Sequence, residues 1–101
     1  MRVKKKLILF LPYSLGKDFI KKYDIKNAKR FFNIKFFDLN KILKKYHYDK
    51  NFDLESNLYD LKKLLISFKP DIGIMFLNDT VHKKIALFCK NIAPIKMLYS
   101  N

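Results

Sequence analysis

Four runs of continuously apolar or β-favouring residues punctuate the chain and predict buried strands. The first is Val3–Leu11, which is uninterrupted from Leu7 until Pro12 ends it. A continuous apolar run is typical of a strand that is buried on both faces of a parallel sheet. The other three runs are Ile34–Asp38, Ile72–Leu77 and Ile95–Tyr99. In the third run, Gly73 indicates a place where a neighbouring group approaches the backbone closely.

Between these runs, apolar residues recur every three or four positions, which predicts amphipathic helices. The apolar positions of the predicted helices are, in order, Leu15, Phe19, Tyr23, Ala28, Phe31 and Phe32; Leu39, Ile42, Leu43 and Tyr46; Leu54, Leu58, Leu61, Leu65 and Phe68; and Val81, Ile85, Phe88 and Ile92. The first helix is expected to break near Asp24, and the polar stretch His47–Asn51 is expected to form an exposed connection. We expect Asp53 to cap the third helix, Pro70 to end it, and Pro94 to end the fourth.

This alternation of strands and helices predicts an α/β fold. Crossovers between parallel strands are nearly always right-handed. The simplest arrangement is therefore a three-layer Rossmann-like domain with a four-stranded, mostly parallel sheet in the order 2-1-3-4. A length of 101 residues fits one domain, 1–101, with a single core. Half of the residues are hydrophobic, so burial can offset the conformational entropy of the chain.

The predicted strand order places a candidate binding site where the direction of chain growth reverses, between the first and third strands. Open α/β sheets bind ligands at such a point, beyond the carboxyl ends of the strands. The candidate ligand-binding residues in the two loops that meet there are Tyr13, Ser14, Gly16, Lys17, Asn78, Asp79 and Thr80. The first loop brings a hydroxyl, a glycine and a cation to a helix N-terminus, whose free amides favour anions. The second loop brings an amide, a carboxylate and another hydroxyl.

A second interpretation of these loop residues stays open, because the same residue types serve as helix caps and in tight turns. The chain contains neither a G-x-G-x-x-G nor a P-loop pattern that would point to a phosphate-binding loop. No catalytic residue can be assigned from the sequence.

The two histidines and the single cysteine point to structural roles. His82 and Cys89 supply two ligands at most, short of the three or four protein ligands that zinc takes. We therefore expect structural roles for His47 and His82, a core position for Cys89, and neither a metal nor a cofactor. One cysteine also excludes an internal disulfide and fits a reducing compartment.

The net charge of +13 attracts polyanions such as nucleic acid or an anionic membrane. Lysine supplies all but two of the basic residues, whereas phosphate and base recognition favours arginine. A solvated lysine surface is therefore preferred over a nucleic-acid role, and peripheral membrane contact stays open. No run approaches the roughly 20 apolar residues that span a bilayer. The run before Pro12 is too short for a signal peptide, so we expect a cytoplasmic protein.

A family resemblance rests on four segments of the chain: LILFLPYSLGKDF, NIKFFDLN, FKPDIGIMFLND and APIKMLYSN. Together they resemble the N-terminal Rossmann-like domain of GT-B glycosyltransferases, including the spore-maturation glycosyltransferase-like group. The most family-like piece is Lys69-Pro70-Asp71, which leads into an apolar strand. The resemblance covers nearly the whole chain. It implies the acceptor-side domain of a protein that builds surface carbohydrate.

In that family the nucleotide-sugar is held mainly by a C-terminal lobe, which these 101 residues lack. The resemblance therefore implies the N-terminal lobe of a larger protein, bound to nucleotide-sugar and carbohydrate acceptor only in the full-length context. The chain alone is expected to be inactive as a transferase. The fourth strand would then present an unpaired edge, which predicts a homodimer or a missing partner. The alternatives are a non-catalytic nucleotide- or partner-binding α/β module and a weak electrostatic nucleic-acid binder.

Overall fold

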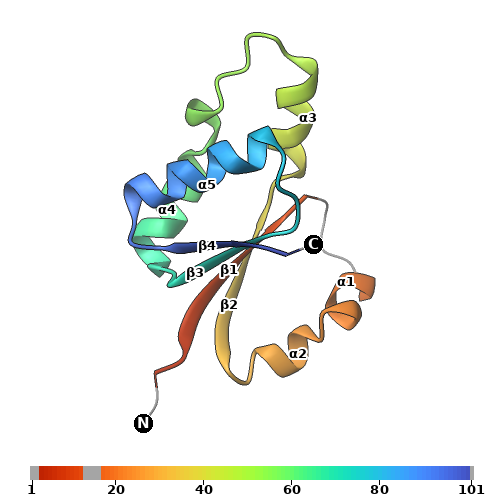
Figure 1. Cartoon of the computed structure of the whole chain (residues 1–101), viewed down its shortest axis with the longest axis vertical. Coiled ribbons are helices and arrows are strands. Elements are labelled where there is room, and N and C mark those ends of the chain that lie inside the picture. The colour runs from red at the N-terminus through yellow and green to blue at the C-terminus, as the bar shows by residue number, and fades with distance from the viewer. Residues whose placement is uncertain (1–2, 13–16, 101) are drawn as a thin grey trace.

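The computed structural model describes residues 3–12 and 17–100, which form alternating strands and helices. The elements are β1 (Lys5–Leu11), α1 (Lys17–Lys22), α2 (Ile25–Ala28), β2 (Phe32–Asp38), α3 (Asn40–Tyr48), the 3-10 helix η1 (Glu55–Asn57), α4 (Tyr59–Phe68), β3 (Ile72–Met75), α5 (Thr80–Ile92) and β4 (Lys96–Tyr99). Figure 1 shows that the helices lie on both sides of a central sheet. The predicted α/β architecture is confirmed.

The sheet contains four strands in the order β2-β1-β3-β4, and each neighbouring pair is parallel. At the centre, Leu9 of β1 pairs with Phe36 of β2 on one side and with Ile74 of β3 on the other. The predicted order is confirmed, and the described strands are all parallel rather than mostly so. This arrangement is the Rossmann-like three-layer fold.

The central strand β1 supplies side chains to the cores on both faces of the sheet. Ile8 and Phe10 belong to the core under α3, α4 and α5, whereas Leu7, Leu9 and Leu11 belong to the core under α1 and α2. Successive side chains of a strand point to opposite faces, so only a continuous apolar run can fill both cores. All five side chains are at most 7% exposed, which confirms the prediction for this segment.

The glycine of β3 lies where the chain has no room for a side chain. A Cβ atom at Gly73 would lie 2.7 Å from the Sδ atom of Met97 and 3.0 Å from the ring of Phe10. Met97 therefore fills the space above the glycine, between β3 and α5. The predicted close approach is confirmed.

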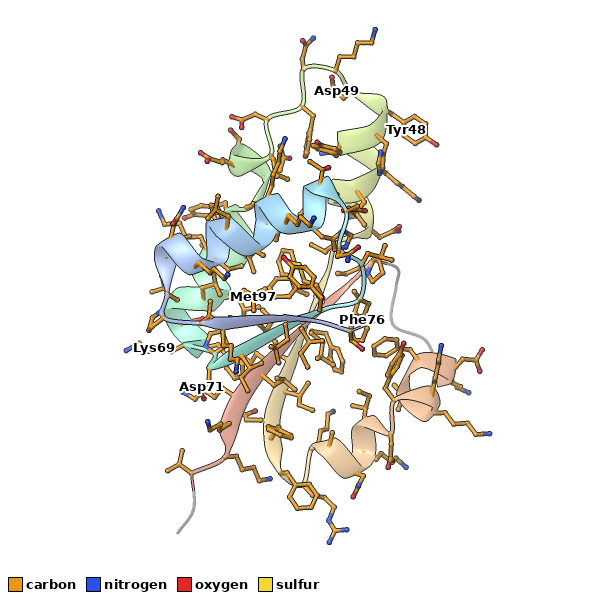
Figure 2. The ribbon with its side chains drawn as sticks, in the orientation of Figure 1. Tyr48, Asp49, Lys69, Asp71, Phe76 and Met97 are labelled. Atoms are coloured by element: carbon orange, nitrogen blue, oxygen red, sulfur yellow. The ribbon has the colours of Figure 1, made fainter. Side chains whose placement is uncertain are left out.

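The segment Lys69-Pro70-Asp71 connects α4 to β3 and ties three strands together. Lys69 adopts the left-handed conformation, with φ of 51°, and ends the helix. Asp71 then donates its backbone N–H to the carbonyl of Lys6, while its Oδ2 accepts from the backbone N–H of Lys6, both at 2.8 Å. The carbonyl of Asp71 accepts from the N–H of Lys96 at 3.0 Å. Figure 2 shows Lys69 and Asp71 close together at the start of β3.

Between β1 and β2, the predicted break at Asp24 is found, but the segment after Ala28 differs from the prediction. Asp24 takes the left-handed conformation, with φ of 49°, and separates α1 from α2, so the expected break is confirmed. The expected continuation of the helix through Phe31 and Phe32 is wrong, because Phe31 lies in a turn and Phe32 begins β2. The alternation of Phe32, Ile34 and Phe36 with polar residues has the period of a strand, and these aromatic and β-branched side chains favour that state.

The remaining boundaries shift by a few residues. The helix expected to end before His47 continues to Tyr48. The connection expected over His47–Asn51 is shifted and runs from Asp49 (Figure 2) to Leu54, just before η1. The long helix expected from Leu54 is divided into η1 and α4. The side chain of Asp53 accepts from the Ser56 hydroxyl rather than from a backbone amide. The strand expected to reach Leu77 ends at Met75.

Candidate functional site

The carboxyl ends of β1 and β3 are adjacent, as the predicted site requires. Phe10 near the end of β1 pairs with Met75 at the end of β3, and the two strands run in the same direction. The loop that follows β3 then leads directly into α5. Any ligand bound beyond these strand ends would therefore meet the first turn of α5.

The structure describes four of the seven predicted site residues. Asn78, Asp79 and Thr80 form the exposed entry to α5, and Lys17 is the first residue of α1. The predictions for Tyr13, Ser14 and Gly16 fall outside the described residues. The three residues of the second loop thus form a polar group beside the carboxyl end of β3.

Asp79 is the N-cap of α5 and holds its first turn. Its Oδ1 accepts from the backbone N–H of His82 at 2.9 Å and lies 2.7 Å from Nδ1 of the same residue. A carboxylate that accepts from the third residue of a helix satisfies one of its free amides and interacts favourably with the helix dipole. The capping interpretation therefore holds for Asp79.

Half of the Asp79 side chain remains exposed, at 49%, so its other oxygen can meet a ligand. Partial burial raises the pKa of Asp79. The hydrogen bonds from the backbone and ring of His82, with electrostatic attraction to His82 and to His47 on α3, outweigh this effect and lower the pKa below its ordinary value. Asp79 is therefore ionised at neutral pH and acts only as a hydrogen-bond acceptor.

His82, for which the sequence predicts only a structural role, lies beside the candidate site. Its side chain is fully buried, and its Nε2 has no hydrogen-bond partner among residues 3–12 and 17–100. Because the Asp79 carboxylate can only accept, Nδ1 of His82 donates the hydrogen bond between the two side chains. The spacing of an aspartate three residues before a histidine, at a predicted helix start, is the signal that could have revealed this pair. The expected structural role of His82 agrees with its burial.

Cys89 does not contribute reactive chemistry. Its side chain is fully buried in the core under α5, and burial raises the pKa of the thiol to about 12. The thiol is therefore protonated at neutral pH, whereas the thiolate is the reactive form. The predicted core position is confirmed. Within residues 3–12 and 17–100, moreover, no three His, Cys, Asp or Glu side chains are grouped so that they could hold a metal ion.

The three larger hollows lined by described residues lie away from the carboxyl ends of the strands. One of about 520 Å³ follows the seam between α4 and α5, where Leu58 and Phe88 form part of its wall. Another, of about 430 Å³, lies where these two helices end, beside Pro70 and Pro94. A third, of about 570 Å³, lies at the amino ends of β1 and β2. None of these three hollows lies at the entry to α5. The candidate site there is therefore identified from its polar side chains.

Comparisons with protein-family models, with curated proteins and with solved structures find no match for this chain. Function is therefore inferred from the fold and from the groups just described. In the described part of the chain, no helix is both long enough and apolar enough to cross a membrane.

Proposed function

We propose that this chain is the acceptor-side domain of a glycosyltransferase of surface carbohydrate synthesis, and that it binds saccharide at the entry to α5. The observation that carries the proposal is the adjacency of the carboxyl ends of parallel β1 and β3, with the exposed polar residues of the β3–α5 loop beside them. Open α/β sheets place their ligands at this position.

The chemistry of the loop favours a ligand rich in hydroxyl groups over a phosphate. Asp79 is ionised and already caps the helix, so a phosphate brought to α5 would meet a negative charge. A saccharide hydroxyl can instead donate to this carboxylate, while the amide of Asn78 and the hydroxyl of Thr80 can each both donate and accept. These three groups fit the acceptor sugar better than the diphosphate of a sugar donor.

Donor binding is assigned to a second domain. The resemblance to GT-B glycosyltransferases supports this division, because in that family the nucleotide-sugar is held by the C-terminal lobe. The chain by itself is then expected to bind an acceptor saccharide weakly and to transfer nothing.

A titration of the 101-residue chain followed by NMR tests this function. Addition of oligosaccharides at millimolar concentration is expected to shift the backbone amide signals of Asn78, Asp79 and Thr80, whereas a nucleoside diphosphate should leave them in place. Asn78→Ala should abolish the shifts. Asn91→Ala, at the other end of α5, should retain them. Shifts that appear with the nucleotide instead would favour the alternative, a nucleotide-binding module.

The net charge of +13 supports a different candidate, a weak electrostatic binder of nucleic acid. Filter binding of single-stranded DNA at low and high salt separates it from saccharide binding. DNA binding that persists at physiological salt and falls steeply as salt is raised further would support this candidate. Loss of all DNA binding at physiological salt would support the acceptor-side domain.

A further inference from the structure

The outer edge of β4 carries backbone groups that face away from the sheet. Lys96 and Ser100 donate their N–H groups to Asp71 and Met75 on the β3 side. In a parallel pair, the N–H and C=O groups of one residue point to the same side of the strand. Those of the next residue point to the opposite side. The N–H and C=O groups of Met97 and Tyr99 therefore point outward, and among the described strands β4 pairs with β3 alone.

Two large apolar side chains, Leu98 and Tyr99, are exposed along this edge, next to the exposed Lys96 and the buried Met97. Leu98 is 40% exposed on the face that carries α1 and α2, and Tyr99 is 42% exposed on the other face. Figure 1 shows α2 next to β2, at the edge of the sheet opposite β4.

The opposite edge of the sheet is better protected. In β2 the polar residues Asn33 and Lys35 are exposed, while Phe32, Ile34 and Phe36 pack against the core under α1 and α2. Lys35 extends over the ring of Phe68, with its Nζ 5.0 Å from the ring centre. A lysine on an edge strand hinders strand addition, and β4 carries one as well, Lys96. Of the two edge strands, however, only β4 exposes large apolar side chains, Leu98 and Tyr99. The edge open to a partner is therefore that of β4.

The charge of the chain decides which kind of partner fits. Two copies that each carry a charge of +13 repel one another, and Lys96 would add to this repulsion at a shared β4 edge. An acidic partner is attracted by the same charge. An extended segment can pair its backbone with Met97 and Tyr99 while its apolar side chains cover Leu98.

From these observations we propose that β4 binds an extended segment of another protein as a fifth strand, and that this segment carries apolar residues interspersed with acidic ones. The surface is separate from the entry to α5, so the proposal goes beyond acceptor binding. It gives the basic, lysine-rich surface a role in selecting an acidic partner rather than a nucleic acid or a second copy.

A short synthetic peptide of alternating valine and glutamate is the probe. Its addition is expected to slow hydrogen exchange at the amides of Met97 and Tyr99 on the order of tenfold, because these groups gain partners. Tyr99→Pro removes one outward N–H without touching the bonds to β3, and should abolish the protection at Met97. Tyr48→Ala, a change at a distant exposed side chain, is the control and should retain it. Circular dichroism establishes that both variants fold.

Three outcomes would overturn the proposal. The first is the absence of protection at both amides. The second is equal binding of a peptide of the same charge with proline at alternate positions, which cannot form a strand and would show attraction by charge alone. The third is a dimer in analytical ultracentrifugation that Tyr99→Pro dissociates, which would make a second copy the occupant of β4.

Discussion

At the scale of single residues, the positions that matter most are those where one atom decides the local packing. Gly73 admits Met97 and Phe10, Asp79 holds the first turn of α5, and Asp71 joins β1 to β4. The first two were predictable from residue type, because glycine within a strand indicates a close approach and aspartate before a helix serves as its cap. The role of Asp71 depends on contacts with residues far away in the chain, so local pattern alone could not predict it.

The first prediction concerns Gly73. Gly73→Ala is expected to lower the free energy of unfolding by about 1 kcal/mol, because the flexible thioether of Met97 can move but the buried ring of Phe10 can yield little. Urea denaturation followed by circular dichroism measures the change. The double variant Gly73→Ala/Met97→Ala should lose less unfolding free energy than the two single variants lose in total. Strict additivity would contradict the proposed contact.

A second prediction concerns the cap of α5. Asp79→Ala is expected to lower the free energy of unfolding by about 1 kcal/mol at neutral pH, the typical cost of a lost N-cap. Although burial raises the pKa of Asp79, the hydrogen bonds from His82 outweigh it and hold the pKa below its ordinary value of 3.8. The ionised cap therefore stabilises the fold above this pH, and its contribution is lost as the pH falls through the folded-state pKa.

Denaturant unfolding of both proteins over a pH series measures this effect. The difference between wild type and Asp79→Ala should shrink as the solution is acidified, and Asp79→Asn, which keeps a capping side chain, should lose less at neutral pH. A difference that does not change with pH would contradict the assigned role of the carboxylate.

At the scale of elements, strands and helices with one clear period were predicted well, and boundaries were predicted poorly. In α5, Val81 and Ile85 are buried as expected, whereas Phe88 and Ile92 are only partly buried. Ala93 leaves the helix just before Pro94. The segment after Ala28 was assigned to the wrong element because Phe31 and Phe32 fit a helical face and a strand equally well by hydrophobicity. The sheet decides in favour of a strand, since β2 needs Phe32 opposite Lys5 of β1.

A third prediction, at this scale, contrasts two neighbouring residues of β4. Leu98→Pro removes an N–H that points toward β3 and should markedly destabilise the domain, whereas Tyr99→Pro removes an outward N–H and should be tolerated. Thermal unfolding followed by circular dichroism compares the two variants. Equal loss of stability would show that the assigned direction of the backbone groups is wrong.

At the scale of the whole molecule, the sheet order and the three layers were predictable because right-handed crossovers leave few alternatives. The site was predictable only to the level of loops, since the capping geometry of Asp79 and the burial of His82 depend on how α5 packs on the sheet. The segment Lys69-Pro70-Asp71 carries much of the family resemblance, and its hydrogen bonds to Lys6 and Lys96 give it a structural role. The case for carbohydrate transfer therefore rests on the strand ends.

Everything proposed for the entry to α5 depends on β1 and β3 lying side by side in the same direction. Nuclear Overhauser contacts between backbone protons of the two strands test this most directly. We expect contacts that link Leu7 with Ile72, Leu9 with Ile74 and Phe10 with Met75. Contacts that instead link Leu7 with Met75, as in an antiparallel pair, or an absence of contacts between the two strands, would contradict the parallel arrangement.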